Sequence, residues 1–153
     1  MTITEGDAAP AFTAARDGGG TLSLSDHADG TVVLFFFPKA DTSGCTKEAI
    51  GFTDHLADFE ALGVTVIGIS KDEIKKQDKF KAKHELGVIL LSDAETTICE
   101  DYGVWVEKSM YGKKYMGIER STFLIQKGKV AKAWRNVKVP GHVEDVLAAA
   151  KAL

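Results

Sequence analysis

The feature that most limits the possible folds is an uninterrupted apolar run from Val32 to Phe37, which stops at Pro38. A run of this length is typical of a strand buried on both faces, and proline ends it because proline has no N–H to donate to a sheet. The next segments alternate between helical and strand patterns: about 43–61 (helix), 64–70 (strand), about 72–85 (helix) and 88–91 (strand). This alternation predicts βαβ crossovers and parallel neighbours in a central sheet.

The rest of the chain predicts shorter elements around this sheet. They are a small hairpin or edge lead-in in residues 1–30, a short helix over 92–102, a long irregular excursion over the surface at 104–117, an antiparallel hairpin of 121–125 and 130–134, and a last helix from about 141. We therefore expect one α/β domain over residues 1–153, a mixed sheet with helices on both faces.

Composition excludes several classes of function. The net charge is −3 and the lysines and arginines are scattered, so there is no basic patch for nucleic acid. No apolar run approaches the roughly 20 residues that span a bilayer, and the N-terminus has no basic segment followed by an apolar one. Two cysteines far apart do not make a disulfide framework. We expect a soluble cytoplasmic protein that does not bind membranes.

Metal binding has no support either, because the four histidines show no paired spacing. Each of them, at positions 27, 55, 84 and 142, is interpreted as a surface or capping residue.

Cys45 is the residue whose predicted position is chemically most informative. Thr42, Ser43 or Gly44 can cap the helix, which places Cys45 in its first turn. Unpaired N–H groups and the helix dipole favour an anion there, and therefore the thiolate, which is the nucleophilic form. The helical stripe on which the cysteine lies faces the core; it comprises Cys45, Ala49, Phe52, Leu56 and Phe59.

Two alternatives remain open in this helix. Cys45 can be a small buried core residue without reactivity, since free cysteine is among the most buried residue types. Gly51 can mark a kink or a helix that unwinds easily, or it can be a close packing contact.

The order Pro38-x-x-x-Thr42-x-x-Cys45, followed by a distant Arg120 just before the strand 121–125, resembles the peroxiredoxins. The local sequence is most similar to the Q-type, or bacterioferritin-comigratory-protein, branch. The likeness extends over nearly the whole chain, through the segments 67–70, 91–93, 102–105, 115–123 and 141–142. This resemblance implies a thioredoxin-like fold and a thiol-dependent peroxidase without a cofactor, acting on hydrogen peroxide and organic hydroperoxides.

The resemblance also implies roles for individual residues. The Cys45 thiolate would attack the peroxide and become a sulfenic acid, and Arg120 would stabilise the thiolate and bind the peroxide oxygens. The backbone N–H groups of Gly44 and Cys45 would add fixed dipoles, the Thr42 hydroxyl would lie in the same pocket, and Pro38 would shield the site from water.

Simpler interpretations stand beside these roles. Arg120 can be a solvated charge at a strand end, and Thr42 can be only an N-cap. Glu48 can orient Arg120 or Lys47, or it can be a favourable charge in the first helical turn.

The second thiol departs from the pattern of this branch. Many Q-type members carry a resolving cysteine five residues after the first, where this chain has Ile50, and others carry it in the next helix, here 72–85, which contains none. Cys99 is the remaining candidate, and its alternative is a half-buried structural thiol. We expect a one-cysteine cycle, in a monomer or weak dimer, that uses thioredoxin, glutaredoxin or a low-molecular-weight thiol as reductant; the alternative is a two-cysteine cycle through Cys99.

Two other classes are less favoured. A thiol–disulfide exchange protein normally needs Cys-x-x-Cys, whereas Cys45 is followed by Thr46, Lys47 and Glu48. A phosphate-binding module would need the Gly-x-x-x-x-Gly-Lys spacing, which the loop lacks.

Overall fold

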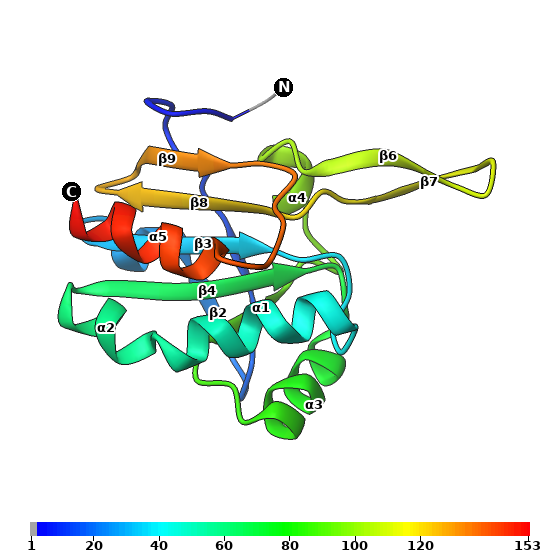
Figure 1. The fold of residues 1–153 in the computed structure, drawn as a ribbon, viewed down its shortest axis with the longest axis horizontal. Helices are drawn as coiled ribbons and strands as arrows, with labels where there is room; N and C mark the ends of the chain where they lie inside the picture. Colours follow the sequence, from blue (N-terminus) through cyan, green and yellow to red (C-terminus); the bar gives the residue numbers. More distant parts are fainter. Residues whose placement is uncertain (1–2) are drawn as a thin grey trace.

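The computed structural model of the protein describes residues 3–153, and Met1 and Thr2, which begin the N-terminal stretch considered above, lie outside them. Seven strands form the main sheet: β1 Thr13–Arg16, β2 Thr21–Ser23, β3 Thr31–Phe36, β4 Val64–Ser70, β5 Ile89–Ser92, β8 Ser121–Gln126 and β9 Lys129–Trp134. Their order is β2-β1-β5-β4-β3-β8-β9 (Figure 1). The predicted parallel arrangement of β3, β4 and β5 is confirmed, as is the β8–β9 hairpin.

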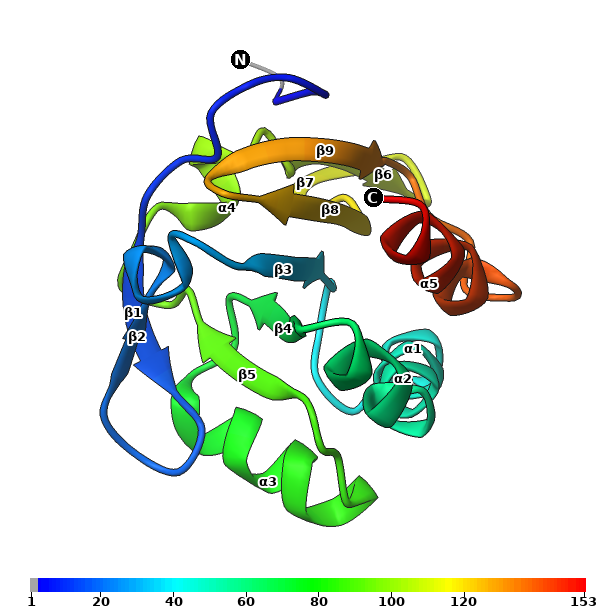
Figure 2. The ribbon, with the colours of Figure 1, turned by 90° about the vertical axis from the view of Figure 1, so that its left-hand side faces the viewer.

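Helices cover the two faces of this sheet unequally. The larger layer consists of α1 Ser43–Asp54, α2 Leu56–Ala61, α3 Ile74–His84 and α5 His142–Lys151. The other face carries the short α4 Ile98–Asp101, the 3-10 turn η1 Leu24–His27 and the N-terminal segment, and Figure 2 shows α4 across the sheet from α1, α2 and α5. The mixed sheet with helices on both faces was predicted correctly.

Two hydrophobic cores result, one on each face of the sheet. Successive side chains of a strand point to opposite faces, so Val32, Leu34 and Phe36 belong to the core beneath α4 and the N-terminal segment. Val33, Phe35 and Phe37 belong to the core beneath α1, α2, α3 and α5. The apolar run that dominates the sequence is therefore buried on both faces, as its composition predicted.

The segment 104–117 differs from the sequence prediction. Instead of an irregular excursion it forms a second antiparallel sheet of two strands, β6 Trp105–Met110 and β7 Lys113–Ile118. Most of its residues are exposed, and the hairpin projects from the body of the molecule (Figure 1). Because neither face of its outer part is buried, the sequence there has no alternation of apolar and polar residues that would indicate strands.

The predicted helix over 92–102 is also shorter than expected. Asp93 accepts hydrogen bonds from the backbone N–H groups of Ile98 and Cys99, at 3.0 and 2.8 Å, and the helix α4 begins only after this turn. The buried Asp93 carboxylate accepts hydrogen bonds from N–H groups at the start of α4 that would otherwise lack partners, so residues 93–97 form a turn and not the first turns of a helix.

The predicted helix over 43–61 is divided at His55, where α1 ends and α2 begins. The division does not coincide with Gly51. A Cβ atom on Gly51 would lie 3.0 Å from Cγ2 of Val143 in α5, so this glycine permits a close contact between two helices. Of the two interpretations of Gly51, the structure supports the packing contact.

The interpretation of every histidine as a surface or capping residue was wrong for His142. Its side chain is buried, and its Nε2 lies 2.8 Å from Oγ1 of Thr122 in β8. Burial among Phe52 and Trp134 lowers the pKa of His142 to about 4 and keeps the ring neutral.

Candidate active site

Cys45 lies in the first turn of α1, directly after the loop that leaves the carboxyl end of β3. Its side chain is 1% exposed and belongs to the core beneath the larger helical layer, as the helical stripe predicted. Thr42 occupies the N-cap position, and its carbonyl accepts the hydrogen bond from the N–H of Thr46 at 2.9 Å. The sulfur is therefore held at the positive end of a 12-residue helix.

Arg120 brings a positive charge to this sulfur. It stands between β7 and β8, one residue before Ser121, which lies opposite Phe36 of β3. Its Nη2 donates to Sγ of Cys45 at 3.3 Å, and its Nη1 donates to Oε1 of Glu48 at 2.8 Å. Burial acts to lower the pKa of Arg120, but the negative charges of Glu48 and Cys45 outweigh it and raise that pKa. The guanidinium thus joins two groups from successive turns of α1.

Glu48 is fully buried, and its second oxygen, Oε2, has no hydrogen-bond partner among residues 3–153. Burial raises the pKa of Glu48 to about 7, and the attraction of Arg120 offsets only part of this effect. Of the interpretations left open for this residue, the contact with Arg120 is the one present, whereas Lys47 is exposed.

Thr42, Gly44 and Pro38, which were also predicted for the site, lie in the segment between β3 and the first turn of α1. The Thr42 hydroxyl donates to the carbonyl of Lys39 at 2.8 Å and makes no capping hydrogen bond. A Cβ atom on Gly44 would lie 3.2 Å from Nη2 of Arg120, so glycine lets the guanidinium approach the helix closely. Pro38 is half-buried and borders the same hollow as Arg120.

This hollow has a volume of about 450 Å³ and lies between the loop after β3 and the base of the β6–β7 hairpin. Most of the side chains around it are polar or charged. They are Pro38, Val106, Glu107, Lys108, Glu119, Arg120, Asn136 and Val137. Sequence reasoning missed Lys108 and Asn136, because they stand in segments without a motif.

The loop that precedes Cys45 is held by two of its residues, Ala40 and Asp41, which contact other elements. Asp41, which has a positive φ of 62°, lies 2.8 Å from both Nζ of Lys83 and Nε2 of His84 at the end of α3. The backbone N–H of Ala40 donates to Oδ2 of Asp72 at 2.7 Å. These contacts link positions more than 30 residues apart, and nothing local in the sequence pointed to them.

Cys99 is not brought to this site. It is completely buried in the core on the opposite face of the sheet from Cys45, so the expectation of a half-buried thiol underestimated its burial. Burial and the neighbouring carboxylate of Asp93 raise the pKa of Cys99, which favours the unreactive thiol.

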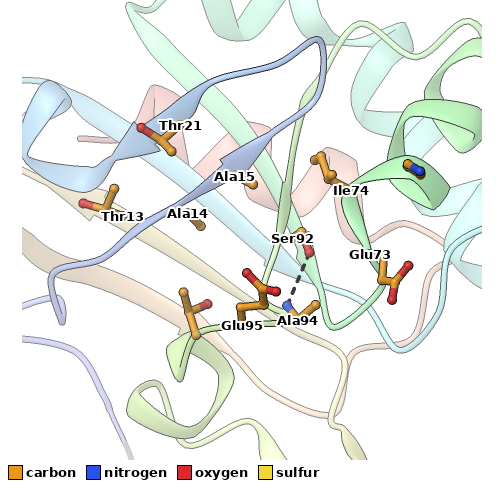
Figure 3. A pocket seen from close by; sticks show the side chains of 11 residues that line it. Thr13, Ala14, Ala15, Thr21, Glu73, Ile74, Ser92, Ala94 and Glu95 are labelled. Atoms are coloured by element: carbon orange, nitrogen blue, oxygen red, sulfur yellow. Dashed lines mark hydrogen bonds between the residues drawn. The ribbon is translucent and has the colours of Figure 1, made fainter.

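A separate cavity of about 640 Å³ lies between the β1–β2 hairpin, the first turn of α3 and the turn after β5 (Figure 3). Threonine, serine and alanine side chains make up most of its wall, and the N–H of Ala94 donates to the Ser92 hydroxyl there. None of the predicted site residues borders it. The hollow beside Arg120 differs in this respect, because Pro38 and Arg120 are part of its wall and Arg120 contacts Cys45, although the Cys45 side chain itself does not line the hollow.

Residues 3–153 contain no group of three or more histidine, cysteine, aspartate or glutamate side chains placed to hold a metal ion. In the same part of the chain, no helix combines the length and apolar character needed to cross a bilayer.

Comparison with known proteins gives a consistent result. Residues 5–133 match the AhpC/TSA family. The chain is 51% identical over 148 residues to a putative peroxiredoxin Bcp of Coxiella burnetii, covering 96% of this chain and 98% of that protein. It is 47% identical to peroxiredoxin Bcp of Bacillus subtilis, covering 96% and 94% of the two chains.

Solved structures agree with these relatives. A PrxQ structure from Xylella fastidiosa superposes with a TM-score of 0.94 at 38% identity, covering 99% of this chain and 98% of the other. A peroxiredoxin Q structure from Xanthomonas campestris gives a TM-score of 0.88 at 43% identity, covering 92% and 90%. The chain therefore belongs to the AhpC/TSA family, within its Bcp and PrxQ peroxiredoxins, and shares their thioredoxin-like fold and their thiol-dependent peroxidase activity.

Proposed function

We propose that this peroxiredoxin reduces hydrogen peroxide and organic hydroperoxides through a sulfenic acid at Cys45, and that an external thiol completes the cycle. The observation that carries the proposal is the position of the sulfur, 3.3 Å from the Arg120 guanidinium at the start of α1, with the second cysteine on the opposite face of the sheet.

In the first half of the cycle the Cys45 thiolate attacks one peroxide oxygen in line with the O–O bond. An S–O bond forms, the O–O bond breaks, and the other oxygen leaves as water or an alcohol after taking up a proton. Negative charge develops on the leaving oxygen during this step. Arg120 and the backbone N–H groups of Gly44 and Cys45 are fixed before the reaction starts, so they stabilise this charge without reorganisation.

The neighbouring residues hold this arrangement. Glu48 positions Arg120, because its Oε1 accepts from the guanidinium at 2.8 Å. Pro38 covers one side of the hollow and limits access of water. Thr42 fixes the loop through the hydrogen bond from its hydroxyl to the Lys39 carbonyl, and a role for this hydroxyl at a bound peroxide would require that bond to break.

In the second half of the cycle an external thiol reduces the sulfenic acid. A disulfide requires Cα atoms about 4.4–6.8 Å apart, whereas Cys45 and Cys99 lie in cores separated by the sheet. Joining them would require a large local rearrangement of the elements that carry them, α1 and α4. The candidates for the reductant are therefore thioredoxin, glutaredoxin or a low-molecular-weight thiol. A protein thiol would reach the 1% exposed Cys45 only after the first turn of α1 unwinds.

The placement of the cysteines fits a reducing compartment. Cys45 and Cys99 lie in separate cores and are not joined in a disulfide, and proteins without disulfides are typical of compartments where cellular thiols keep cysteines reduced. We propose that the protein works in the cytoplasm as a monomer or weak dimer.

The test of the proposal is rapid mixing of reduced protein with one equivalent of hydrogen peroxide, in the presence of a sulfenic-acid trap, followed by intact mass and peptide mapping. We expect one trap adduct at Cys45, both in the wild type and in Cys99→Ser. A loss of two hydrogens with a Cys45–Cys99 link would establish the two-cysteine cycle instead, and no modification at all would refute the assignment of Cys45.

A further inference from the structure

Lys108 is a charged side chain at the active site to which the proposed cycle gives no role. It lies on β6, and its side chain borders the hollow that Pro38 and Arg120 also border. Residues 106, 108 and 110 point to one face of the hairpin, together with their partners across the pair, Gly117, Tyr115 and Lys113.

The packing of the hairpin directs Lys108 toward the site. A Cβ atom on Gly117 would lie 3.1 Å from Cδ of Lys108 and 3.3 Å from Cε2 of Tyr115. Gly117 is opposite Val106, which is nearer the body of the molecule than Lys108. The lysine stem therefore runs over the glycine toward the base of the hairpin, and not toward its exposed tip.

The ammonium group shares its surroundings with the reacting sulfur. Burial and the charge of Arg120 lower the pKa of Lys108, while the charges of Cys45 and Glu119 act in the opposite direction. Arg120 and Glu119 border the hollow together with Lys108, and Cys45 lies 3.3 Å from Arg120. The position of Lys108 thus places it within electrostatic reach of Cys45.

The carboxylates around the hollow have other partners. Glu107 pairs with Lys114 at 3.6 Å, and Glu119 pairs with Arg135 at 3.8 Å. In the part of the chain that the structure describes, no carboxylate lies within 4.0 Å of the Lys108 ammonium. The hollow therefore offers a positive charge that the protein itself does not neutralise by contact.

The charge balance of the site changes during the catalytic cycle. In the reduced state, the Cys45 thiolate of the proposed cycle and the partly ionised Glu48 carboxyl offset the positive charges of Arg120 and Lys108. Formation of the sulfenic acid removes the thiolate charge and makes the net charge of the site more positive by one unit. The oxidised site thus attracts an anion at the stage when the reductant must bind.

We propose that Lys108 recognises the carboxylate of a small thiol that reduces the Cys45 sulfenic acid. The inference rests on the proposed one-cysteine cycle and specifies the chemical class of its reductant. The volume of about 450 Å³ suits a small molecule, because pockets for such ligands measure about 300–1,000 Å³.

The reaction balances with two molecules of thiol. The sulfur of the first attacks the sulfenic sulfur, an S–S bond forms, the S–O bond breaks, and the hydroxyl leaves with a proton as water. The second thiolate attacks the sulfur of the bound thiol in the mixed disulfide. It releases the disulfide of the reductant and restores the Cys45 thiolate.

The experiment compares three small thiols of different charge on Cys45 sulfenic acid prepared with hydrogen peroxide. The thiols are 3-mercaptopropionate (carboxylate), 2-mercaptoethanol (neutral) and cysteamine (ammonium), and their rate constants are normalised to thiolate concentration. The proteins are the wild type, Lys108→Met, Lys108→Arg and Lys113→Met. Lys113 is on the same face of the hairpin but near its tip, so it controls for loss of a hairpin charge.

We expect the wild type to react faster with 3-mercaptopropionate than with 2-mercaptoethanol. Lys108→Met should reduce the ratio of these two rate constants about fivefold. A factor of about five corresponds to about 1 kcal/mol, the interaction energy of unit charges about 4 Å apart in water. In the same variant, the rate constant for cysteamine should rise relative to that for 2-mercaptoethanol, because the repulsion between its ammonium group and Lys108 is removed. Lys108→Arg and Lys113→Met should keep the wild-type preference, and salt should weaken it.

Equal preferences in the wild type and Lys108→Met would overturn the inference, as would a sulfenic acid that no small thiol reduces; in both cases the peroxide step would still stand. Failure to form the sulfenic acid in the wild type would instead refute the proposed function itself. If Lys108→Met does not fold, Lys108→Glu must reverse the preference for the inference to stand.

Discussion

Replacing Glu48 with glutamine tests the electrostatics at the centre of the site. The buried carboxyl of Glu48 has its pKa raised from 4.5 to about 7. A group whose pKa is higher in the folded protein than in the unfolded chain binds more protons when folded, so stability falls as the pH rises between the two values. Each pKa unit corresponds to about 1.4 kcal/mol, so complete ionisation of Glu48 lowers the free energy of unfolding by about 3.5 kcal/mol.

Glutamine has the shape of the protonated glutamate and does not ionise. The free energy of unfolding of the wild type, minus that of Glu48→Gln, should therefore decrease by about 2.5 kcal/mol between pH 5 and pH 8, because the remainder of the effect falls below pH 5. Other titrating groups contribute equally to the pH dependence of unfolding in both proteins, so their contributions cancel in the difference. His142 is among them: its pKa is about 4 in the folded protein and about 6.5 in the unfolded chain, so its contribution changes up to about pH 6.5 and is removed only because both proteins share it.

The assay is urea unfolding of the reduced proteins at pH 5, 6, 7 and 8, with the slope of each transition checked for two-state behaviour. Glu60→Gln changes an exposed glutamate of α2 and controls for the loss of a surface charge. A difference between wild type and Glu48→Gln that stays constant from pH 5 to pH 8 would refute the reasoning, because the carboxyl would then ionise equally in the folded and unfolded chains.

Two further predictions concern the groups on either side of the sheet. Arg120→Lys removes the planar fork that contacts Cys45 and Glu48 at once, and we expect the rate constant for hydrogen peroxide, measured by stopped flow, to fall by about 10²-fold. An unchanged rate constant would show that a point charge is sufficient. Cys99→Ala creates a small cavity in a closed core, so we expect a loss of about 1 kcal/mol in urea unfolding with sulfenic acid formation at Cys45 unaltered. Slower sulfenic acid formation in this variant would show that packing around Cys99 affects the reactivity of Cys45 across the sheet.

Local patterns in the sequence were sufficient to predict the position of Cys45. The apolar run 32–37, Pro38 and the helical stripe after residue 43 are each set by neighbours in the chain, and the structure has all three as predicted. Arg120 could be proposed only through the resemblance to peroxiredoxins. The contact itself joins residues 75 positions apart, and no periodicity encodes such a distance.

The errors share a physical cause. The β6–β7 hairpin has exposed residues on both faces of its outer part, so it lacks the alternation that marks a strand packed on a core. The one local indication of a hairpin was its turn at Tyr111 and Gly112, which both have a positive φ, as two-residue hairpin turns of type I′ require. His142 begins a helix, where a polar side chain is usually solvated. Here Phe52 and Trp134, from distant segments, enclose it.

Gly51 shows how a local propensity and a tertiary contact can be separated by experiment. In an isolated helix, Gly→Ala is favourable by about 0.5–1 kcal/mol. In this protein the added Cβ would lie 3.0 Å from Cγ2 of Val143, so the contact opposes that gain. Val143→Ala removes this methyl group, and Gly51→Ala should then stabilise the protein by about 0.5–1 kcal/mol, whereas the same change in the wild type should give less or be unfavourable. The double-mutant cycle in urea unfolding measures the difference directly. An equal effect in both backgrounds would mean that the two helices move apart without cost, and that α1 is less firmly held against α5 than the packing around Cys45 indicates.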